Sequence, residues 1–137
     1  GVRVVVTGSE RDAETINEVR EKTGAGAVFF PGKTNIKQLA ALIAKFSVFI
    51  SGATGAMHLS AAVGVPSVVF YTHIPAVSEK RWGAWMSESA VIKPPEGECS
   101  HSRKRKHTES ACGCMEHIKA EEVAAAAAAF VSKRRLG

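Results

Sequence analysis

Short apolar segments alternate with longer amphipathic ones, and this alternation limits the possible folds more than any other feature of the sequence. The apolar segments at residues 2–7, 27–30, 47–51 and 65–71 are rich in β-branched and aromatic residues, as buried strands are. Strands that alternate with helices predict a parallel sheet with right-handed crossovers. We therefore expect an α/β fold in which helices cover both faces of the sheet.

The sequence between these strands is typical of helices. A capping box at residues 9–12 begins a helix that we expect to end near Thr23. Thr34 or Asn35 would cap the second helix, and residues 58–63 form the third. Residues 90–92 predict a last short strand. The final helix, at residues 120–133, carries an apolar stripe formed by Val123, Ala127, Phe130 and Val131.

The size and composition indicate one globular domain. The chain has 137 residues, of which 45% are hydrophobic and 23% charged, as expected for a folded domain with a single core. Its longest apolar runs are too short to span a bilayer. Because the sequence opens directly in a strand, we expect residues 1–137 to be a single-domain fragment of a larger protein.

The turn after the third strand is the candidate ligand site. In open parallel sheets, ligands bind beyond the carboxyl ends of the strands. Residues 52–58 are mostly small and lead into a helix, whose first N–H groups favour a phosphate without a metal. Thr54 either caps this helix or donates its hydroxyl to a phosphate, and His58 lies one turn further. An ordinary strand-to-helix turn, with His58 as a helix residue, is the alternative.

Two segments resemble a known family. Residues 32–43 (GKTNIKQLAALI) are similar to the segment G-x-[ST]-s-l-x-e-L-a-a-l-I, and residues 54–66 (TGAMHLSAAVGVP) to the segment D-[ST]-G-x-x-H-x-A-A-x-G-x-P. Both occur in glycosyltransferase family 9, the ADP-heptose:lipopolysaccharide heptosyltransferases. The segment C-x-C-M-x-x-I at residues 112–118, followed by a helix with an acidic start, also resembles the C-terminal end of that family.

The resemblance implies a GT-B fold, in which two Rossmann-like domains face a cleft. This chain would be most of the C-terminal, nucleotide-sugar-binding half, without the first strand of that half. The implied function is transfer of a sugar from an ADP-heptose-like donor to a lipopolysaccharide-core-type acceptor, lipid-linked or phosphorylated. The implied location is the cytoplasm, at the inner face of the inner membrane with a peripheral membrane contact. No cofactor, metal or nucleic acid is implied, and the isolated fragment would be inactive.

Site residues follow from the same resemblance. Thr54 and Gly55 match positions that hold the diphosphate, and His58 matches a histidine one helical turn along. The donor-binding set that we expect is Glu10, Thr54, Gly55, Ala56, Met57 and His58. Glu10 would bind the ribose diol, or it is an acid favoured by the dipole of a helix start. The acceptor-activating base would come from the missing domain, so no catalytic residue is assigned.

The sequence departs from the family at two places. Ala53 stands where the family carries an aspartate, and residues 71–75 read YTHIP where the family has G-P-T-D-P. These departures leave two interpretations open. The protein is either a divergent transferase with another donor or a degenerate, non-catalytic nucleotide-binding domain.

A metal-binding or nucleic-acid-binding module is the alternative from another functional class. Residues 93–114 predict a long polar loop. The potential zinc ligands in and near it are Cys99, His101, His107, Cys112, Cys114 and His117. Their spacing matches no standard zinc finger, and an odd number of cysteines argues for reduced thiols.

Basic residues account for the net charge of +5 and gather at residues 103–106 and 133–135. They favour anionic partners, or they are a solvated loop and a helix end that prefers positive charge.

A purely structural fragment is the last alternative. Without its first strand, the sheet would have an unpaired edge. Trp82 and Trp85 would then either pack on the missing domain or belong to the local core.

Overall fold

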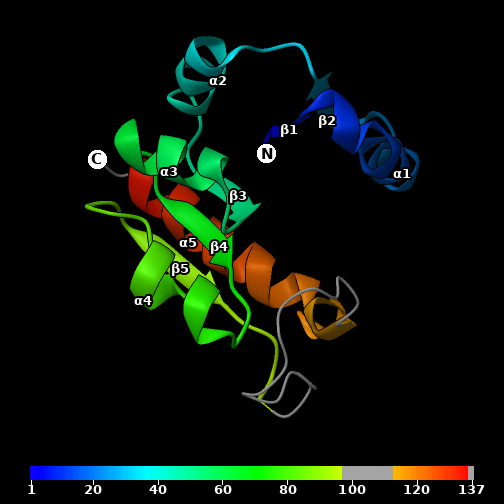
Figure 1. The fold of residues 1–137 in the computed structure, drawn as a ribbon. Coiled ribbons are helices and arrows are strands. Elements are labelled where there is room, and N and C mark those ends of the chain that lie inside the picture. Colours follow the sequence, from blue (N-terminus) through cyan, green and yellow to red (C-terminus); the bar gives the residue numbers. More distant parts are fainter. Residues whose placement is uncertain (97–112, 136–137) are drawn as a thin grey trace. The chain divides into compact units, whose positions relative to one another are not determined.

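The structure is a computed structural model that describes residues 1–96 and 113–135 (Figure 1). The polypeptide divides into two compact units, Gly1–Ala41 and Leu42–Gly137, and each is described by itself. That the whole chain forms one nucleotide-sugar-binding domain stays a prediction.

The first unit is a strand–helix–strand motif. β1 (Val4–Gly8) and β2 (Ala27–Pro31) pair in parallel, from Val4 opposite Ala27 to Gly8 opposite Pro31. Between them, a 3₁₀ turn (Glu10–Asp12) leads into α1 (Ala13–Thr23), and a second 3₁₀ turn (Gly24–Gly26) leads out. α1 packs on this pair through Ile16, which is 4% exposed.

The predicted capping box is present. The carboxylate of Asp12 accepts hydrogen bonds from the backbone N–H and the hydroxyl of Ser9, both at 2.7 Å. Both hydrogen bonds lower the pKa of Asp12, and the one from the hydroxyl has the larger effect. The helix that follows ends at Thr23, as expected.

α2 (Ile36–Ile43) contains the boundary between the two units. Of the two candidate caps, Asn35 is the one used. Its side-chain oxygen accepts from the N–H of Gln38, whose side chain accepts from the N–H of Asn35, both at 2.9 Å. This reciprocal pair satisfies two of the N–H groups that a helix start leaves without partners.

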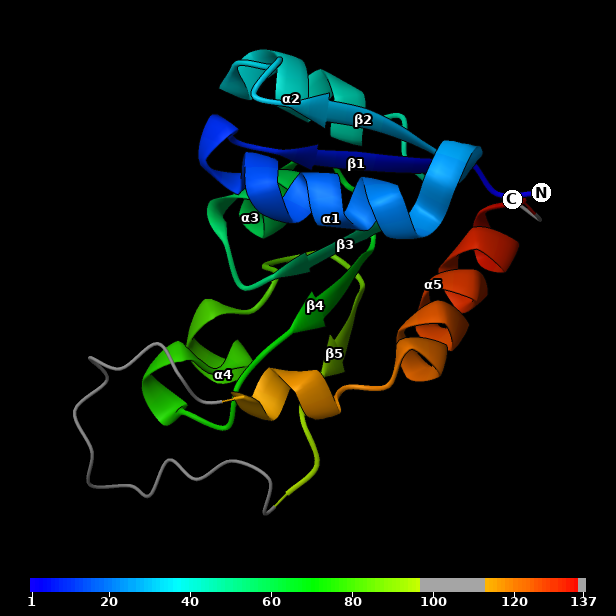
Figure 2. The same ribbon diagram turned by 90° about the vertical axis from the view of Figure 1, so that its right-hand side faces the viewer.

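The second unit contains a three-stranded parallel sheet in the order β3-β4-β5. Its strands are β3 (Phe49–Gly52), β4 (Ser67–Phe70) and β5 (Ser89–Ile92). The described helical elements of this unit, apart from the end of α2, are α3 (Gly55–Ala62), a 3₁₀ turn (Pro75–Val77), α4 (Glu79–Trp82), a 3₁₀ turn (Gly113–His117) and α5 (Ala120–Arg135). α3 packs against β3 and β4, and α5 packs against β4 and lies along one side of the strands in Figure 2. The expected α/β fold with parallel strands flanked by helices is confirmed.

Burial differs between the two sheets. The central strand β4 is buried at its first three residues, as expected for a strand covered on both faces. In the first unit, Val4 and Val28 are 49% and 42% exposed. Within that unit, β1 and β2 pair only with each other, and α1 is the helix that packs against them.

Two buried serines fix the connection from α3 into β4. The hydroxyl of Ser60 donates to the carbonyl of Val65 at 3.0 Å, and the hydroxyl of Ser67 donates to Ser60 at 3.2 Å. Gly64 adopts a φ of 73° in the turn between them, where a side chain would be strained. These contacts hold α3 in a fixed position on the sheet.

Within the two described stretches, no helix has both the length and the apolar character that a membrane span requires.

Candidate functional site

The predicted turn joins β3 to α3 at the carboxyl end of the sheet. α3 begins at Gly55, three residues earlier than expected, because Thr54 is extended (φ −126°, ψ 171°) and is the N-cap residue. Its carbonyl accepts the N–H of Met57 at 3.1 Å. The N–H groups of Gly55 and Ala56 come before the first intrahelical acceptor, so the helix itself cannot satisfy them.

The side chain of Thr54 is exposed and makes no capping hydrogen bond. A capping threonine would normally donate or accept locally. Next to it, a Cβ atom placed on Gly55 would meet no other described residue within 4 Å, apart from its chain neighbours and the backbone of its own helix. The turn therefore presents a free hydroxyl, two free N–H groups and open space, which together suit an anion.

Met57 faces the other way. Its side chain is 0% exposed and packs with Val69 and Tyr71 in the core, so it supports the helix from below. Its N–H is already bound to Thr54. The residues of this turn with groups free to meet a ligand are therefore Thr54, Gly55 and Ala56.

His58 lies on the exposed side of α3 and contacts an aromatic ring. The ring centroids of His58 and Trp82 are 6.4 Å apart, and the planes meet at 63°. No local sequence pattern indicates this pairing, because Trp82 is remote in sequence and no periodicity links it to α3.

The segment between β4 and β5 is folded tightly over the carboxyl end of the sheet. The hydroxyl of Tyr71 donates to the carbonyl of Trp82 at 2.8 Å, and the indole N–H of Trp82 donates to the carbonyl of Ala76 at 3.1 Å. His73 Nε2 lies 2.7 Å from the carbonyl oxygen of Pro94. Tyr71 and His73 belong to the stretch that departs from the family motif, and both are used here to pack this segment.

An ion pair ties α4 to the end of β5. Lys93 Nζ lies 2.8 Å from Glu79 Oε1, and both side chains are partly buried. This hydrogen bond lowers the pKa of Glu79. Burial, followed by the charge of Glu79, raises the pKa of Tyr71. The second carboxylate oxygen of Glu79 is buried and has no hydrogen-bond partner among the described residues, which costs stability. The Lys93 contact is therefore the interaction that stabilises this carboxylate at the start of α4.

Removing this carboxylate should give a pH-dependent loss of stability. Since folding lowers the pKa of Glu79, its stabilisation is present above the ordinary value of 4.5 and disappears as pH falls through the lower folded value. We expect Glu79→Gln to cost about 1 kcal/mol at neutral pH and progressively less as pH falls below 4.5. Urea unfolding at a series of pH values from neutral downward checks this. The exposed Glu96→Gln is the control, and an equal cost at all pH values would contradict the assignment.

Glu10 lies in the first unit, directly after β1. It is exposed, in a 3₁₀ turn at the start of α1, and its Cγ stands 2.5 Å from the Cβ position of Gly32. Gly32 has a φ of 61°, so this turn after β2 needs glycine. Glu10 is therefore at the carboxyl end of its own sheet. The helix-start interpretation and the ribose interpretation both fit this place.

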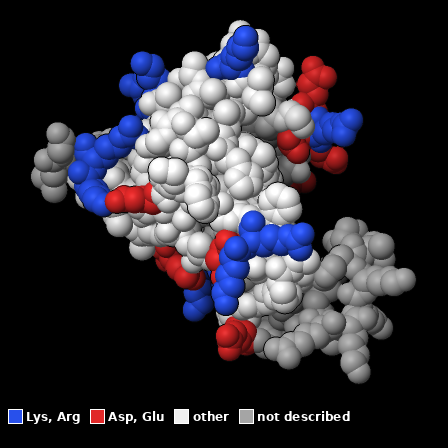
Figure 3. Space-filling view, turned by 60° about the vertical axis from the view of Figure 1, so that its left-hand side comes forward, with Lys and Arg blue, Asp and Glu red and all other residues white. Residues whose placement is uncertain are grey.

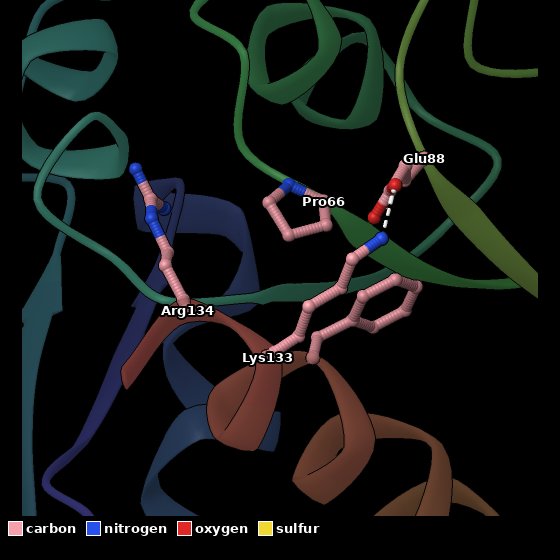
Figure 4. Close-up of a pocket in the computed structure, with 5 residues that line it drawn as sticks. Pro66, Glu88, Lys133 and Arg134 are labelled. Atoms are coloured by element: carbon pink, nitrogen blue, oxygen red, sulfur yellow. Dashed lines mark hydrogen bonds and ion pairs between the residues drawn. The ribbon is translucent and has the colours of Figure 1, made fainter. Parts of the chain in front are cut away.

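A surface pocket of about 220 Å³ lies at the opposite, amino end of the second sheet (Figure 4). The residues lining it are Pro66, Glu88, Phe130, Lys133 and Arg134. Lys133 pairs with Glu88 at 2.5 Å, and Arg134 donates to the carbonyl of Phe46. Because it lies away from the carboxyl ends of the strands, this pocket is not the predicted ligand site. Its lining shows instead that Lys133 and Arg134, at the end of α5, make contacts within the protein.

The metal and nucleic-acid alternatives stay predictions, because most of the residues that they involve lie outside the described ones. No three His, Cys, Asp or Glu side chains among the described residues are grouped to hold a metal ion. Cys114 is buried, at 3% exposed. The face shown in Figure 3 is mostly neutral, with Lys and Arg side chains in separate small groups. The other candidate ligands in the 99–112 stretch and the basic residues 103–106 lie outside the described residues.

The two tryptophans differ in exposure. Trp82 is 49% exposed and Trp85 is 81% exposed, so the local-core expectation is wrong for Trp85. That they pack on the rest of a larger protein stays a prediction.

Comparisons with known proteins agree with the resemblance. The family model described as glycosyltransferase family 9 (heptosyltransferase) matches residues 1–112. A similar curated protein is lipooligosaccharide heptosyltransferase 2 of Haemophilus influenzae, 29% identical over 107 residues, which cover 72% of this chain and 31% of that protein.

A solved structure shares the fold. The glycosyl transferase family 9 protein from Veillonella parvula DSM 2008 matches with a TM-score of 0.79 at 23% identity, over 97% of this chain and 37% of that one. The chain thus spans about a third of the length of these relatives. The family match covers most of the sequence, including the turn from β3 into α3. The chain therefore belongs to glycosyltransferase family 9, the heptosyltransferase family.

Proposed function

We propose that this chain binds the diphosphate of a nucleotide sugar at the start of α3, and that the full-length protein transfers the sugar to a hydroxyl of its acceptor. One observation supports this most strongly. Thr54 has a free hydroxyl beside the unsatisfied N–H groups of Gly55 and Ala56, at the carboxyl end of a parallel sheet, where such folds bind ligands.

The chemistry that this arrangement supports is electrostatic. Transfer breaks the bond between the sugar and the diphosphate, so negative charge develops on the leaving nucleoside diphosphate. The positive end of α3, its free N–H groups and the Thr54 hydroxyl are fixed before the reaction and would stabilise that charge. His58, one turn along the same helix, would add a further donor. The base that activates the acceptor belongs to the rest of the protein.

We further propose an ADP-heptose-like donor and a lipopolysaccharide-core-type acceptor. The family's description as heptosyltransferase and the name of the Haemophilus relative support this choice. Glu10 would accept hydrogen bonds from the ribose diol. Such an acceptor places the reaction in the cytoplasm, at the inner face of the inner membrane.

Thermal-shift measurements on the full-length protein test the proposal. A ligand that binds only the native state stabilises it by about 2.7 kcal/mol at 100 times its Kd. We expect an ADP-linked sugar to raise the melting temperature more than UDP- or GDP-linked sugars do. Thr54→Val, which keeps the shape and removes the hydroxyl, should reduce the shift. No shift with any of the three nucleotide sugars would reject the proposal.

Ala53 favours a second candidate, a nucleotide-binding domain without transferase activity. The family pattern has a carboxylate at this position, directly before the threonine of the turn, and alanine cannot replace its charge. Saturable binding of a nucleotide sugar with no transfer to any acceptor by the full-length protein would support this second candidate.

A further inference from the structure

We propose that Trp82 is a positioning residue for His58. This inference rests on the proposed function, because it concerns how His58 is presented to the donor. The two rings meet edge to face, with centroids 6.4 Å apart and planes at 63°. Aromatic pairs prefer this geometry at centroid separations of about 4.5–7 Å.

His58 depends on this contact for its orientation. It is exposed on α3, and the Trp82 ring is the one ring contact, hydrogen bond or ion pair that the described residues give its side chain. An exposed imidazole without a neighbour samples several rotamers. The indole therefore selects one orientation beside the start of α3.

Trp82 is itself held firmly. Its indole N–H is bound to the carbonyl of Ala76 at 3.1 Å, and its own carbonyl accepts the hydroxyl of Tyr71 at 2.8 Å. Tyr71 is 2% exposed and packs with Met57, the neighbour of His58 in α3. Trp82 is thus connected to α3 in two ways. Its ring contacts His58 at the surface, and its carbonyl is bonded to Tyr71, which packs on Met57 in the core.

The backbone around Trp82 is equally constrained. The Glu79–Lys93 ion pair holds the start of α4. Directly after Trp82, a Cβ atom on Gly83 would lie 2.5 Å from the carbonyl oxygen of Glu79. Only glycine allows this close approach without movement of the backbone. The segment between β4 and β5 therefore holds the Trp82 ring in a fixed position.

The expected kinetic effect follows from this arrangement. Trp82→Ala keeps the backbone carbonyl that accepts the Tyr71 hydroxyl, so the packing of Tyr71 on Met57 and the binding of the donor should survive loss of the indole. An unrestrained imidazole, in contrast, is rarely in the productive orientation. We expect Trp82→Ala in the full-length protein to lower kcat by about 2- to 10-fold, the fold-change that corresponds to the interaction energy of an aromatic pair, with a smaller change in KM.

A double-mutant cycle isolates the contact. Trp82→Ala should have no further effect when His58 is already alanine, because the two residues act through each other. Trp82→Phe, which keeps an aromatic edge, should restore most of the activity. Val77→Ala, at an exposed position of the same segment, is the control and should leave kcat unchanged. Equal losses with and without His58 would overturn the proposal.

A second readout does not need activity. In the NMR spectrum of the full-length protein with labelled histidines, the imidazole protons of His58 should shift on Trp82→Ala, because the ring current of the indole is lost. The Val77→Ala control should leave them in place. Unshifted His58 signals in Trp82→Ala would refute the positioning role. Absence of transfer in the wild-type protein would reject the proposed function alone, and the NMR comparison would then decide on the positioning role.

Discussion

Gly55→Val should abolish nucleotide-sugar binding in the full-length protein while leaving it folded. A Cβ atom on Gly55 meets no other described residue within 4 Å, apart from its chain neighbours and the backbone of its own helix, so the valine side chain would occupy the space where the diphosphate approaches the backbone. Loss of two hydrogen bonds to a charged group, at about 1.5 kcal/mol or more each, lowers the affinity at least roughly 100-fold. Titration calorimetry with the nucleotide sugar measures this change.

Gly26→Val provides the matched control for that substitution. Gly26 also has no other described residue within 4 Å of its Cβ position, with the same exceptions, but it lies at the end of the 3₁₀ turn before β2, away from α3 in sequence. We expect the affinity of the Gly26→Val variant for the nucleotide sugar to stay at the wild-type value. Wild-type affinity in Gly55→Val would show that the ligand does not approach this backbone.

Met57→Ala should cause the largest loss of stability among the substitutions proposed for α3. Met57 is 0% exposed and lies in the core cluster with Val69 and Tyr71. Truncating a fully buried methionine leaves a cavity and costs about 2–5 kcal/mol. Chemical denaturation of the full-length protein, followed by circular dichroism, measures the change in the free energy of unfolding.

The conservative change Met57→Leu keeps the volume and should cost less than about 1.5 kcal/mol. A ligand role for the Met57 side chain predicts a different pattern. It would give a loss of nucleotide-sugar affinity with little loss of stability in Met57→Ala, and that result would contradict the core assignment.

The order of helices and strands was predictable because short-range sequence patterns determine each element. Alternation of apolar and amphipathic segments locates each strand and helix, and the Ser9–Asp12 and Asn35–Gln38 pairs mark helix starts through side-chain chemistry that acts over three residues. Boundaries were less predictable. α3 begins at Gly55 and not near His58, because glycine and alanine carry too little apolar pattern to show that a helix has begun.

The contacts around the candidate site were not predictable, because they join residues far apart in the sequence. Nothing local indicates that Trp82 meets His58 or that Tyr71 donates to the carbonyl of Trp82. Met57 illustrates the same limit. Its place in a family motif suggested a ligand role, whereas helical geometry turns its side chain into the core.

The most direct test of the account observes the backbone of α3 while the ligand binds. In an amide-resolved NMR titration of the full-length protein, a saturating ADP-linked sugar should move the N–H signals of Gly55 and Ala56 downfield, as hydrogen bonding to a phosphate does. The fitted Kd should equal the calorimetric value. If binding saturates and both amide signals stay where they were, the diphosphate is held elsewhere and the central claim is wrong.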